Sequence, residues 1–394
     1  MNKRLFISTL LLLLLALFVS ACGKAPEDLT SREIIDGIEY VRNTALPLRP
    51  DITLSLEEEL SIGGEDDQGN IILYETGSVI VDAGGDMYIV DRQDAQIKVF
   101  DPEGNFIRSI GRKGEGPGEF QVVAYVMFVP DDRLLVMDFM ARRTSLLERS
   151  GDFISSHQWT KSFSQPVLTT DSSYFVREMV AEEGADALSE RRLVMDELDF
   201  EGNDIRSFGD YTLPEMRMLR QGNIMFGMSV PHSPQSIFTG DMANQCFYHC
   251  LNDTYLIEVL NTEGNVFRKI DRPYDPLPYT SKDKEEVLAR FWERGNPEQM
   301  KLVEGMDFPA VKNVIERMTT DDEGNLWVAT HEIREEGDVK ARAYDIFDRD
   351  GTYDMRLWLE RRPSAFMRGK MYVHYTDPDT GYTFIKRFRM IWGE

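Results

Sequence analysis

Short apolar runs alternate with polar turn residues along most of the chain, and the pattern is clearest in residues 78–120. Four runs of strand length follow one another there: Val79–Val81, Met87–Val90, Ile97–Phe100 and Phe106–Ile110. Gly, Asp, Asn and Pro separate these runs, and such residues supply the backbone angles of tight turns. The segment therefore predicts four short antiparallel strands joined by hairpin turns.

The third turn of this unit recurs along the chain. Its glycine is found as Gly104, Gly151, Gly202, Gly264 and Gly351, and PDTGY at 378–382 is a weaker sixth copy. Six four-stranded units predict an all-β fold, a six-bladed β-propeller of antiparallel blades. Two β-sandwiches end to end are the alternative, but a turn repeated at this spacing favours a ring of blades.

Residues 51–394 are the predicted propeller domain. Ring closure usually places strands from both chain ends in one blade. We expect residues 52–64 to form the outer strand of the last blade, and 365–369, 370–376 and 382–392 to form its inner three.

The interval between Gly264 and Gly351 is longer than the others and predicts an insertion at about 275–313. Thr280 and Asp283 fit a capping box, and Gly295 fits a helix stop. Apolar residues follow at helical spacing: Val287, Leu288, Phe291 and Trp292. We expect a helix on one rim, where it either packs on the body or contributes to a binding surface.

The first residues are typical of a secretory signal peptide. A basic start precedes an apolar stretch that is short for a membrane span, and small residues then lead to Cys22. The ending resembles a bacterial lipobox, which predicts a signal at 1–21, lipidation of Cys22 and a tether over 22–50. Attached acyl chains would anchor the protein to a bacterial membrane, and we expect the periplasmic or surface face of the outer membrane.

The segment IKVFDPEGNFIRSIGRKGEGPGEF (97–120) resembles an NHL-type repeat. The mature chain is similar to the six-bladed β-propeller lipoproteins of the Bacteroidetes and their relatives. This resemblance implies the fold and an exported location, and it implies no defined activity.

The glycine-rich stretch GRKGEGPGEF (111–120) is the strongest candidate for a phosphate loop. A strand-like sequence follows it, no Gly-Lys-Ser/Thr is present, and Glu115 and Glu119 would repel phosphate. We interpret it as a crossing between blades, with Phe120 wedged between them.

The net charge of the chain narrows the classes of partner that it can bind. The formal net charge of −24 argues against nucleic acid as a binding partner.

Cys246 and Cys250 lie too far apart on an extended strand to form a disulfide, and His249 points away from both. Two buried thiols are therefore favoured over a metal site. We expect a monomer that contacts the membrane through its lipid and binds an unidentified protein, peptide or small molecule.

Candidate site residues lie at or near the ends of second strands, where propellers place functional groups around the channel. They are Asp91, Asp138, Arg177, His249, His331 and His374. Three histidines from different blades could bind zinc, and a histidine with an aspartate could act as a general base. Hydrogen bonding at the blade edges is the simpler interpretation, and the Asp-rich turns are hairpins rather than calcium loops.

The sequence thus predicts a membrane-anchored ligand-binding or protein-interaction module of the cell envelope, with no cofactor. A metal-dependent, lactonase-like hydrolase or lyase that uses zinc or calcium in the channel is the alternative. It requires the histidines and aspartates to meet at one end of the channel.

Overall fold

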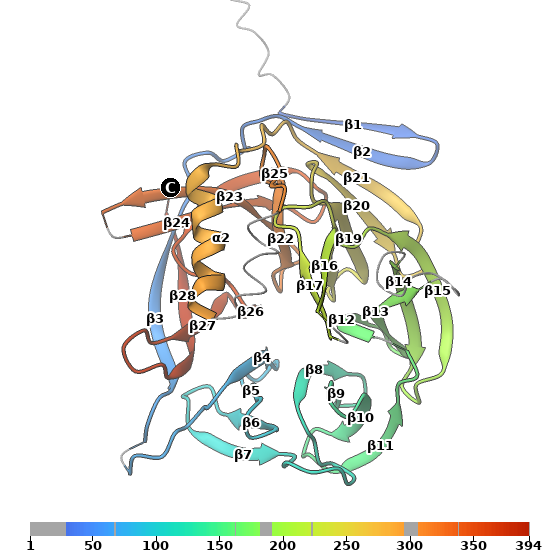
Figure 1. The fold of residues 1–394 in the computed structure, drawn as a ribbon, viewed down its shortest axis with the longest axis vertical. Coiled ribbons are helices and arrows are strands. Elements are labelled where there is room, and N and C mark those ends of the chain that lie inside the picture. Colours follow the sequence, from blue (N-terminus) through green and yellow to red (C-terminus); the bar gives the residue numbers. More distant parts are fainter. Residues whose placement is uncertain are drawn as a thin grey trace, which may run out of the picture.

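The computed structural model describes residues 29–66, 68–161, 163–181, 191–221, 224–294, 306–337 and 339–393. Six small antiparallel sheets surround a central axis, as Figure 1 shows, and the predicted six-bladed β-propeller is confirmed. Each blade runs from an innermost strand at the channel to an outermost strand at the periphery.

The four strands of a blade follow one another in order from the innermost to the outermost. Blade 1 is β4 (Thr76–Val81), β5 (Met87–Asp91), β6 (Gln96–Phe100) and β7 (Phe106–Ile110). Blade 2 is β8 (Val123–Val129), β9 (Arg133–Asp138), β10 (Arg143–Glu148) and β11 (Phe153–Gln158). Blade 3 is β12 (Phe163–Thr169), β13 (Ser173–Ala181), β14 (Arg191–Asp199) and β15 (Asp204–Tyr211). Blade 4 is β18 (Ser236–Asp241), β19 (Cys246–Leu251), β20 (Leu256–Asn261) and β21 (Val266–Asp271). Blade 5 is β22 (Ile315–Thr320), β23 (Leu326–Glu336), β24 (Val339–Phe347) and β25 (Tyr353–Leu359). Blade 6 is β26 (Ala365–Met367), β27 (Lys370–Thr376), β28 (Thr383–Gly393) and β3 (Thr53–Gly63).

The recurring glycine of the third turn marks a contact between blades. In five blades it lies against the outermost strand of the preceding blade. The pairs are Gly104 with Leu60, Gly151 with Ile110, Gly202 with His157, Gly264 with Phe208, and Gly351 with Ile270. At Gly202 a Cβ would lie 2.2 Å from the His157 ring, and φ is +88°, so glycine suits both the space and the backbone.

The prediction of a sixth copy of this turn at residues 378–382 is wrong. Gly381 lies between β27 and β28, which are the second and third strands of blade 6, and a Cβ there would meet nothing within 4 Å. Blade 6 takes its third and fourth strands from opposite ends of the chain, so no hairpin joins them.

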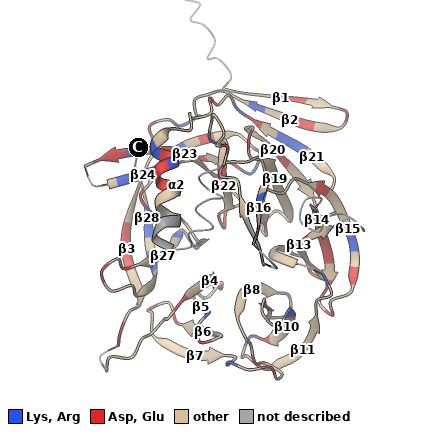
Figure 2. Ribbon diagram, in the orientation of Figure 1, with Lys and Arg blue, Asp and Glu red and all other residues tan. Residues whose placement is uncertain are grey.

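The ring closes as predicted, because β3 pairs antiparallel with β28 from Gly63↔Phe384 to Thr53↔Gly393. Figure 2 shows acidic positions on β3 beside basic positions on β28. Lys386 pairs with Glu58 at 3.1 Å, and Arg389 pairs with Glu57. Pairing over the whole length of β3 holds the two ends of the propeller together.

Residues 30–43, expected within the tether, instead form strands β1 (Thr30–Ile35) and β2 (Ile38–Asn43). This hairpin extends blade 4, with β2 parallel to β21. Asn43 is buried, and its Nδ2 donates to the carbonyl oxygens of Asp271 at 3.2 Å and Gly351 at 3.0 Å. The expected tether is therefore wrong over these residues, because β2 pairs with β21 and Asn43 bonds the segment to blades 4 and 5.

Two insertions precede innermost strands and therefore lie on the same face of the ring. Helix α2 (Ser281–Arg294) comes before β22. The predicted capping box is confirmed, because the Thr280 N–H donates to Asp283 Oδ2 at 2.8 Å and the Asp283 N–H donates to Thr280 Oγ1 at 3.3 Å. The hairpin β16 (Met216–Gln221) with β17 (Ile224–Ser229) comes before β18 and was not expected. In Figure 1 helix α2 lies on the near side of the ring.

The core consists of apolar clusters, most of which span two neighbouring blades. Phe120 is fully buried in the cluster shared by blades 1 and 2, which confirms the predicted blade crossing. Cys246 and Cys250 are buried and unpaired, and burial raises the pKa of the Cys246 thiol to about 12. Over the part of the chain that the structure describes, no helix is both long and apolar enough to cross a membrane.

Candidate functional site

The central channel holds a cavity of about 820 Å³. The first strands of blades 1 to 5 contribute Thr76, Tyr125, Val167, Thr239 and Thr319, and Ser364 precedes the first strand of blade 6. A propeller brings its innermost strands to the axis, so residues far apart in the sequence meet in this cavity.

Four arginines line this cavity: Arg92, Arg177, Arg317 and Arg362. Glu75 is the one carboxylate among the described lining residues, and it lies 3.8 Å from Arg92. Arg317 has a neighbour in Glu316 at 3.6 Å. Arg177 and Arg362 have no ion-pair partner within the described ranges. The channel is therefore cationic in a protein of net charge −24.

Arg177 extends from β13 of blade 3, and Arg317 extends from β22 of blade 5. Burial lowers the pKa of Arg177, and its Nε has no hydrogen-bond acceptor among the described residues. Burial and then the charge of Arg362 lower the pKa of Arg317. Arginine remains protonated in proteins, so both side chains hold incompletely balanced positive charge.

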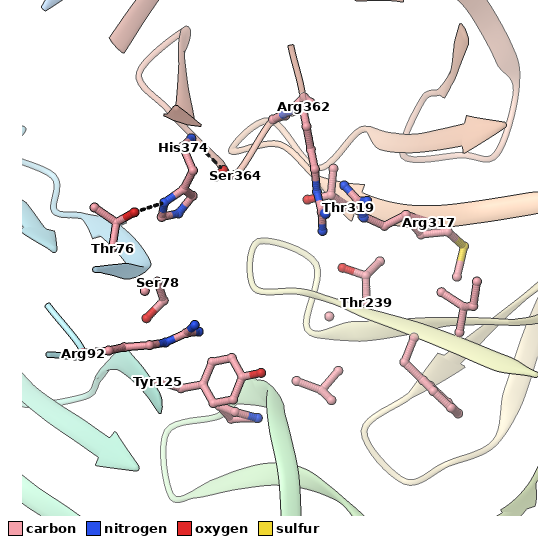
Figure 3. A pocket seen from close by; sticks show the side chains of 18 of the residues that line it. Thr76, Ser78, Arg92, Tyr125, Thr239, Arg317, Thr319, Arg362, Ser364 and His374 are labelled. Carbon is pink, nitrogen blue, oxygen red and sulfur yellow. Dashed lines mark hydrogen bonds between the residues drawn. The ribbon is translucent and has the colours of Figure 1, made fainter. Parts of the chain in front are cut away.

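His374 lies at the wall of the same cavity and is hydrogen-bonded in place. Its Nδ1 lies 3.1 Å from the Thr76 hydroxyl, and its backbone N–H donates to Ser364 Oγ at 3.3 Å, as Figure 3 shows. Partial burial, followed by the charges of Arg92 and Arg362, lowers its pKa. His374 thus contributes a neutral imidazole at neutral pH.

The two predicted aspartates have structural partners. Asp91 is fully buried, accepts from the Tyr74 N–H at 2.9 Å, and pairs with Lys98 at 2.9 Å. Asp138 is fully buried and accepts backbone N–H groups of Gln121 at 2.7 Å and Val122 at 3.1 Å. Each carboxylate holds the chain that enters its blade, which explains why the residue recurs after the second strand.

His249 is held within blade 4. Its ring bonds Glu258 at 3.0 Å and Ser236 at 3.1 Å, and it stacks on Phe238 with centroids 4.6 Å apart. Both ring nitrogens are therefore engaged by protein groups, which leaves the imidazole with a packing role.

His331 lines a second cavity of about 730 Å³ beside helix α2. Its Nε2 lies 2.6 Å from Asn313 Oδ1, and the same oxygen lies 2.7 Å from His232 Nδ1. Burial, followed by the neighbouring His232, lowers the pKa of His331 to about 3. His232, which carried no signal in the sequence, packs beside His331 with ring centroids 4.6 Å apart.

The structure therefore brings together two of the six predicted residues, Arg177 and His374. Asp91 and Asp138 lie inside blades, His249 lies in the body of blade 4, and His331 lies in the cavity beside α2. The described residues include no group of three or more His, Cys, Asp or Glu side chains that could hold a metal ion. The convergence that a metal-dependent hydrolase or lyase requires is not observed among them.

Three arginines of the channel were missed: Arg92, Arg317 and Arg362. No local motif distinguishes them from the many surface arginines of the chain. One signal was available, because Arg92 directly follows Asp91, at the end of a second strand that was already identified.

Comparisons with known proteins support the fold. Residues 72–185 match the family DUF5128, described as a 6-bladed beta-propeller. A Bacteroides fragilis protein described as exported is 12% identical, with a TM-score of 0.52 over 89% of this chain and 99% of its own. A member of the DUF4221 family from Bacteroides vulgatus is 11% identical, with a TM-score of 0.50 over 86% and 99%.

Virginiamycin B lyase from Staphylococcus aureus is 8% identical, with a TM-score of 0.40 over 86% of this chain and 100% of its own. Similarity at this level has no bearing on activity. A search of curated protein sequences finds no match.

Proposed function

We propose that this protein is an exported, lipid-anchored binding module that takes an anionic small molecule into its central channel. The observation that carries the proposal is the set of four arginines facing one carboxylate in a cavity of about 820 Å³. Cavities of this size accommodate small-molecule ligands.

The charge distribution supports an anion rather than a neutral or cationic ligand. The chain as a whole carries a net charge of −24, yet its channel concentrates guanidinium groups. Removing a cation from water without a counter-charge is unfavourable, and Arg177 and Arg317 are both partly buried. An anion with good geometry would balance these charges through bidentate hydrogen bonds.

Export and anchoring rest on the N-terminal pattern. The basic start, the apolar stretch and Cys22 lie outside the described residues, and they remain the reason for proposing a lipid anchor. A binding module held at the membrane would present its channel to solutes of the cell envelope.

Calorimetric titration of the purified full chain in detergent, with inorganic sulfate and with citrate, tests the channel. We expect at least one of these anions to bind, and Arg362→Gln to weaken binding by roughly 10-fold, because one charge-assisted contact is lost. Arg389→Gln is the matched control, since Arg389 pairs with Glu57 on the outer strands. Citrate affinity that is equal in wild type and Arg362→Gln, or failure of sulfate, citrate and every larger acidic probe to bind, would contradict the proposal.

A further inference from the structure

The arginines of the channel come from different parts of the ring. Arg92 follows β5 in blade 1, Arg177 belongs to β13 in blade 3, Arg317 belongs to β22 in blade 5, and Arg362 precedes β26 of blade 6. Figure 3 shows Arg317 and Arg362 on one side of the cavity and Arg92 on the opposite side. The positive charge is therefore distributed around the cavity.

We infer, building on the proposed function, that the ligand carries two or more acidic groups set apart on a hydroxyl-rich frame. Polycarboxylate hydroxy acids and acidic oligosaccharides share this chemistry. A compact anion such as sulfate can contact one group of arginines at a time and leaves the opposite side of the cavity without an anionic ligand group. A ligand with separated acidic groups can satisfy both sides at once.

The rest of the lining explains the hydroxyl-rich frame. Between the arginines the cavity is lined by the hydroxyl-bearing residues Thr76, Thr239, Thr319 and Ser364. Hydroxyl groups both donate and accept hydrogen bonds, so they suit a ligand that bears hydroxyl groups of its own. The neutral ring of His374 and the phenol of Tyr125 lie on the same wall and add further partners.

The cavity is large for a single inorganic anion. Its volume of about 820 Å³ falls in the upper part of the range of about 300–1,000 Å³ typical of small-molecule sites. A ligand that spans from Arg92 to Arg362 would fill more of it and would exclude water from the charged contacts, which strengthens them.

The test compares probes that differ in how their charges are spaced. Calorimetric titrations of the full chain with citrate, digalacturonate and inorganic sulfate are performed at equal ionic strength. We expect citrate or digalacturonate to bind roughly 10-fold or more tightly than sulfate, since each additional charge-assisted contact adds about one order of magnitude. Tighter binding of digalacturonate than of citrate would identify an acidic sugar as the ligand class. Tighter binding of citrate would identify a polycarboxylate.

Variants on opposite sides of the cavity sharpen the test. Arg92→Gln and Arg362→Gln should each weaken binding of the tighter of the two organic acids by roughly 10-fold, because each removes one charge-assisted contact. The double variant should bind it more weakly than either single variant. Sulfate binding should weaken in only one of the two single variants. Near-UV circular dichroism checks that each variant is folded, and Arg92→Lys, which keeps the charge, should retain most of the affinity.

Two outcomes would be informative in different ways. Sulfate binding as tight as that of both organic acids would overturn the inference while leaving an anion-binding channel in place. Failure of all three anions to bind would overturn the proposed function itself, and the inference with it.

Discussion

At the scale of single residues, the glycine-rich segment 111–120 shows how a local sequence serves an interface between blades. Gly111 has φ +80°, and a Cβ there would lie 2.5 Å from the ring of Phe120. Phe120 in turn is fully buried among residues of blades 1 and 2. The glycine permits the turn and leaves room for the aromatic ring, so the segment belongs to packing rather than to phosphate binding.

Gly111→Ala should destabilise the fold through two effects. A left-handed backbone costs a residue with a Cβ about 1–2 kcal/mol, and crowding of a packed core costs about 1–3 kcal/mol. Gly118→Ala is the matched control in the same segment, because Gly118 has φ +69° but a Cβ there would meet only Phe153 at 3.7 Å. Equilibrium unfolding in urea should show a loss of about 2–5 kcal/mol for the first variant and about 1–2 kcal/mol for the second. Equal losses would mean that the contact with Phe120 carries no energy.

At the scale of elements, the closing strand β3 connects the first described part of the chain to the last blade. Leu56 on β3 lies opposite Met390 on β28, and both pack against the apolar cluster shared with blade 5. Ser55, the next residue along, is exposed on the other face of the strand. The alternation of inward and outward side chains thus holds for the strand that completes the ring.

A charge placed on the inward face of β3 should therefore weaken the closure. We expect Leu56→Asp to reduce the free energy of unfolding by about 3 kcal/mol, because a carboxylate would be partly buried without a partner. Ser55→Asp adds the same charge to the same strand on the solvent side and should change stability by less than about 0.5 kcal/mol. Tryptophan fluorescence during denaturant unfolding measures both variants. Similar losses in the two would show that added negative charge, rather than broken packing, is responsible.

At the scale of the whole molecule, charge is separated between the exterior and the axis. The chain has 68 acidic and 44 basic residues, yet the central cavity is lined by four arginines and one glutamate. Both insertions, α2 and the β16–β17 hairpin, lie on the face where the innermost strands begin. The two insertions thus lie on one face of the ring, while the other face carries short turns between the described strands.

The proposed anchor also belongs to this scale, because it determines where the whole propeller resides. Cys22→Ala should abolish incorporation of labelled fatty acid in the native host and move the protein from the membrane fraction to the soluble fraction. Ser20→Ala, a change two residues away that keeps the cysteine, is the control and should leave the protein in the membrane fraction. Membrane retention of Cys22→Ala would rule out lipidation at this position as the anchor.

Much of the fold could be predicted from the sequence because the signals are local. Strand periodicity, the repeated glycine turn and the Thr280–Asp283 capping box each depend on residues a few positions apart, and each is confirmed. The β16–β17 hairpin escaped prediction although its two strands are neighbours in the sequence. The β1–β2 hairpin escaped prediction as part of the propeller, because an extended segment joins a sheet only where a partner strand is available. For β2 that partner is β21, which is far away in the sequence.

The candidate site is a product of the tertiary structure. Asp91 and Asp138 recur at equivalent positions, and the sequence could show the recurrence but not that backbone N–H groups occupy both carboxylates. Arg92, Arg177, Arg317 and Arg362 follow no common motif and meet only because six innermost strands surround one axis. The blades themselves could be derived from the chain, because their hydrogen bonds and turns are set by neighbouring residues. Which residues line the channel could not be derived from the sequence. The lining depends on closure of the ring and on contacts between segments separated by up to several hundred residues.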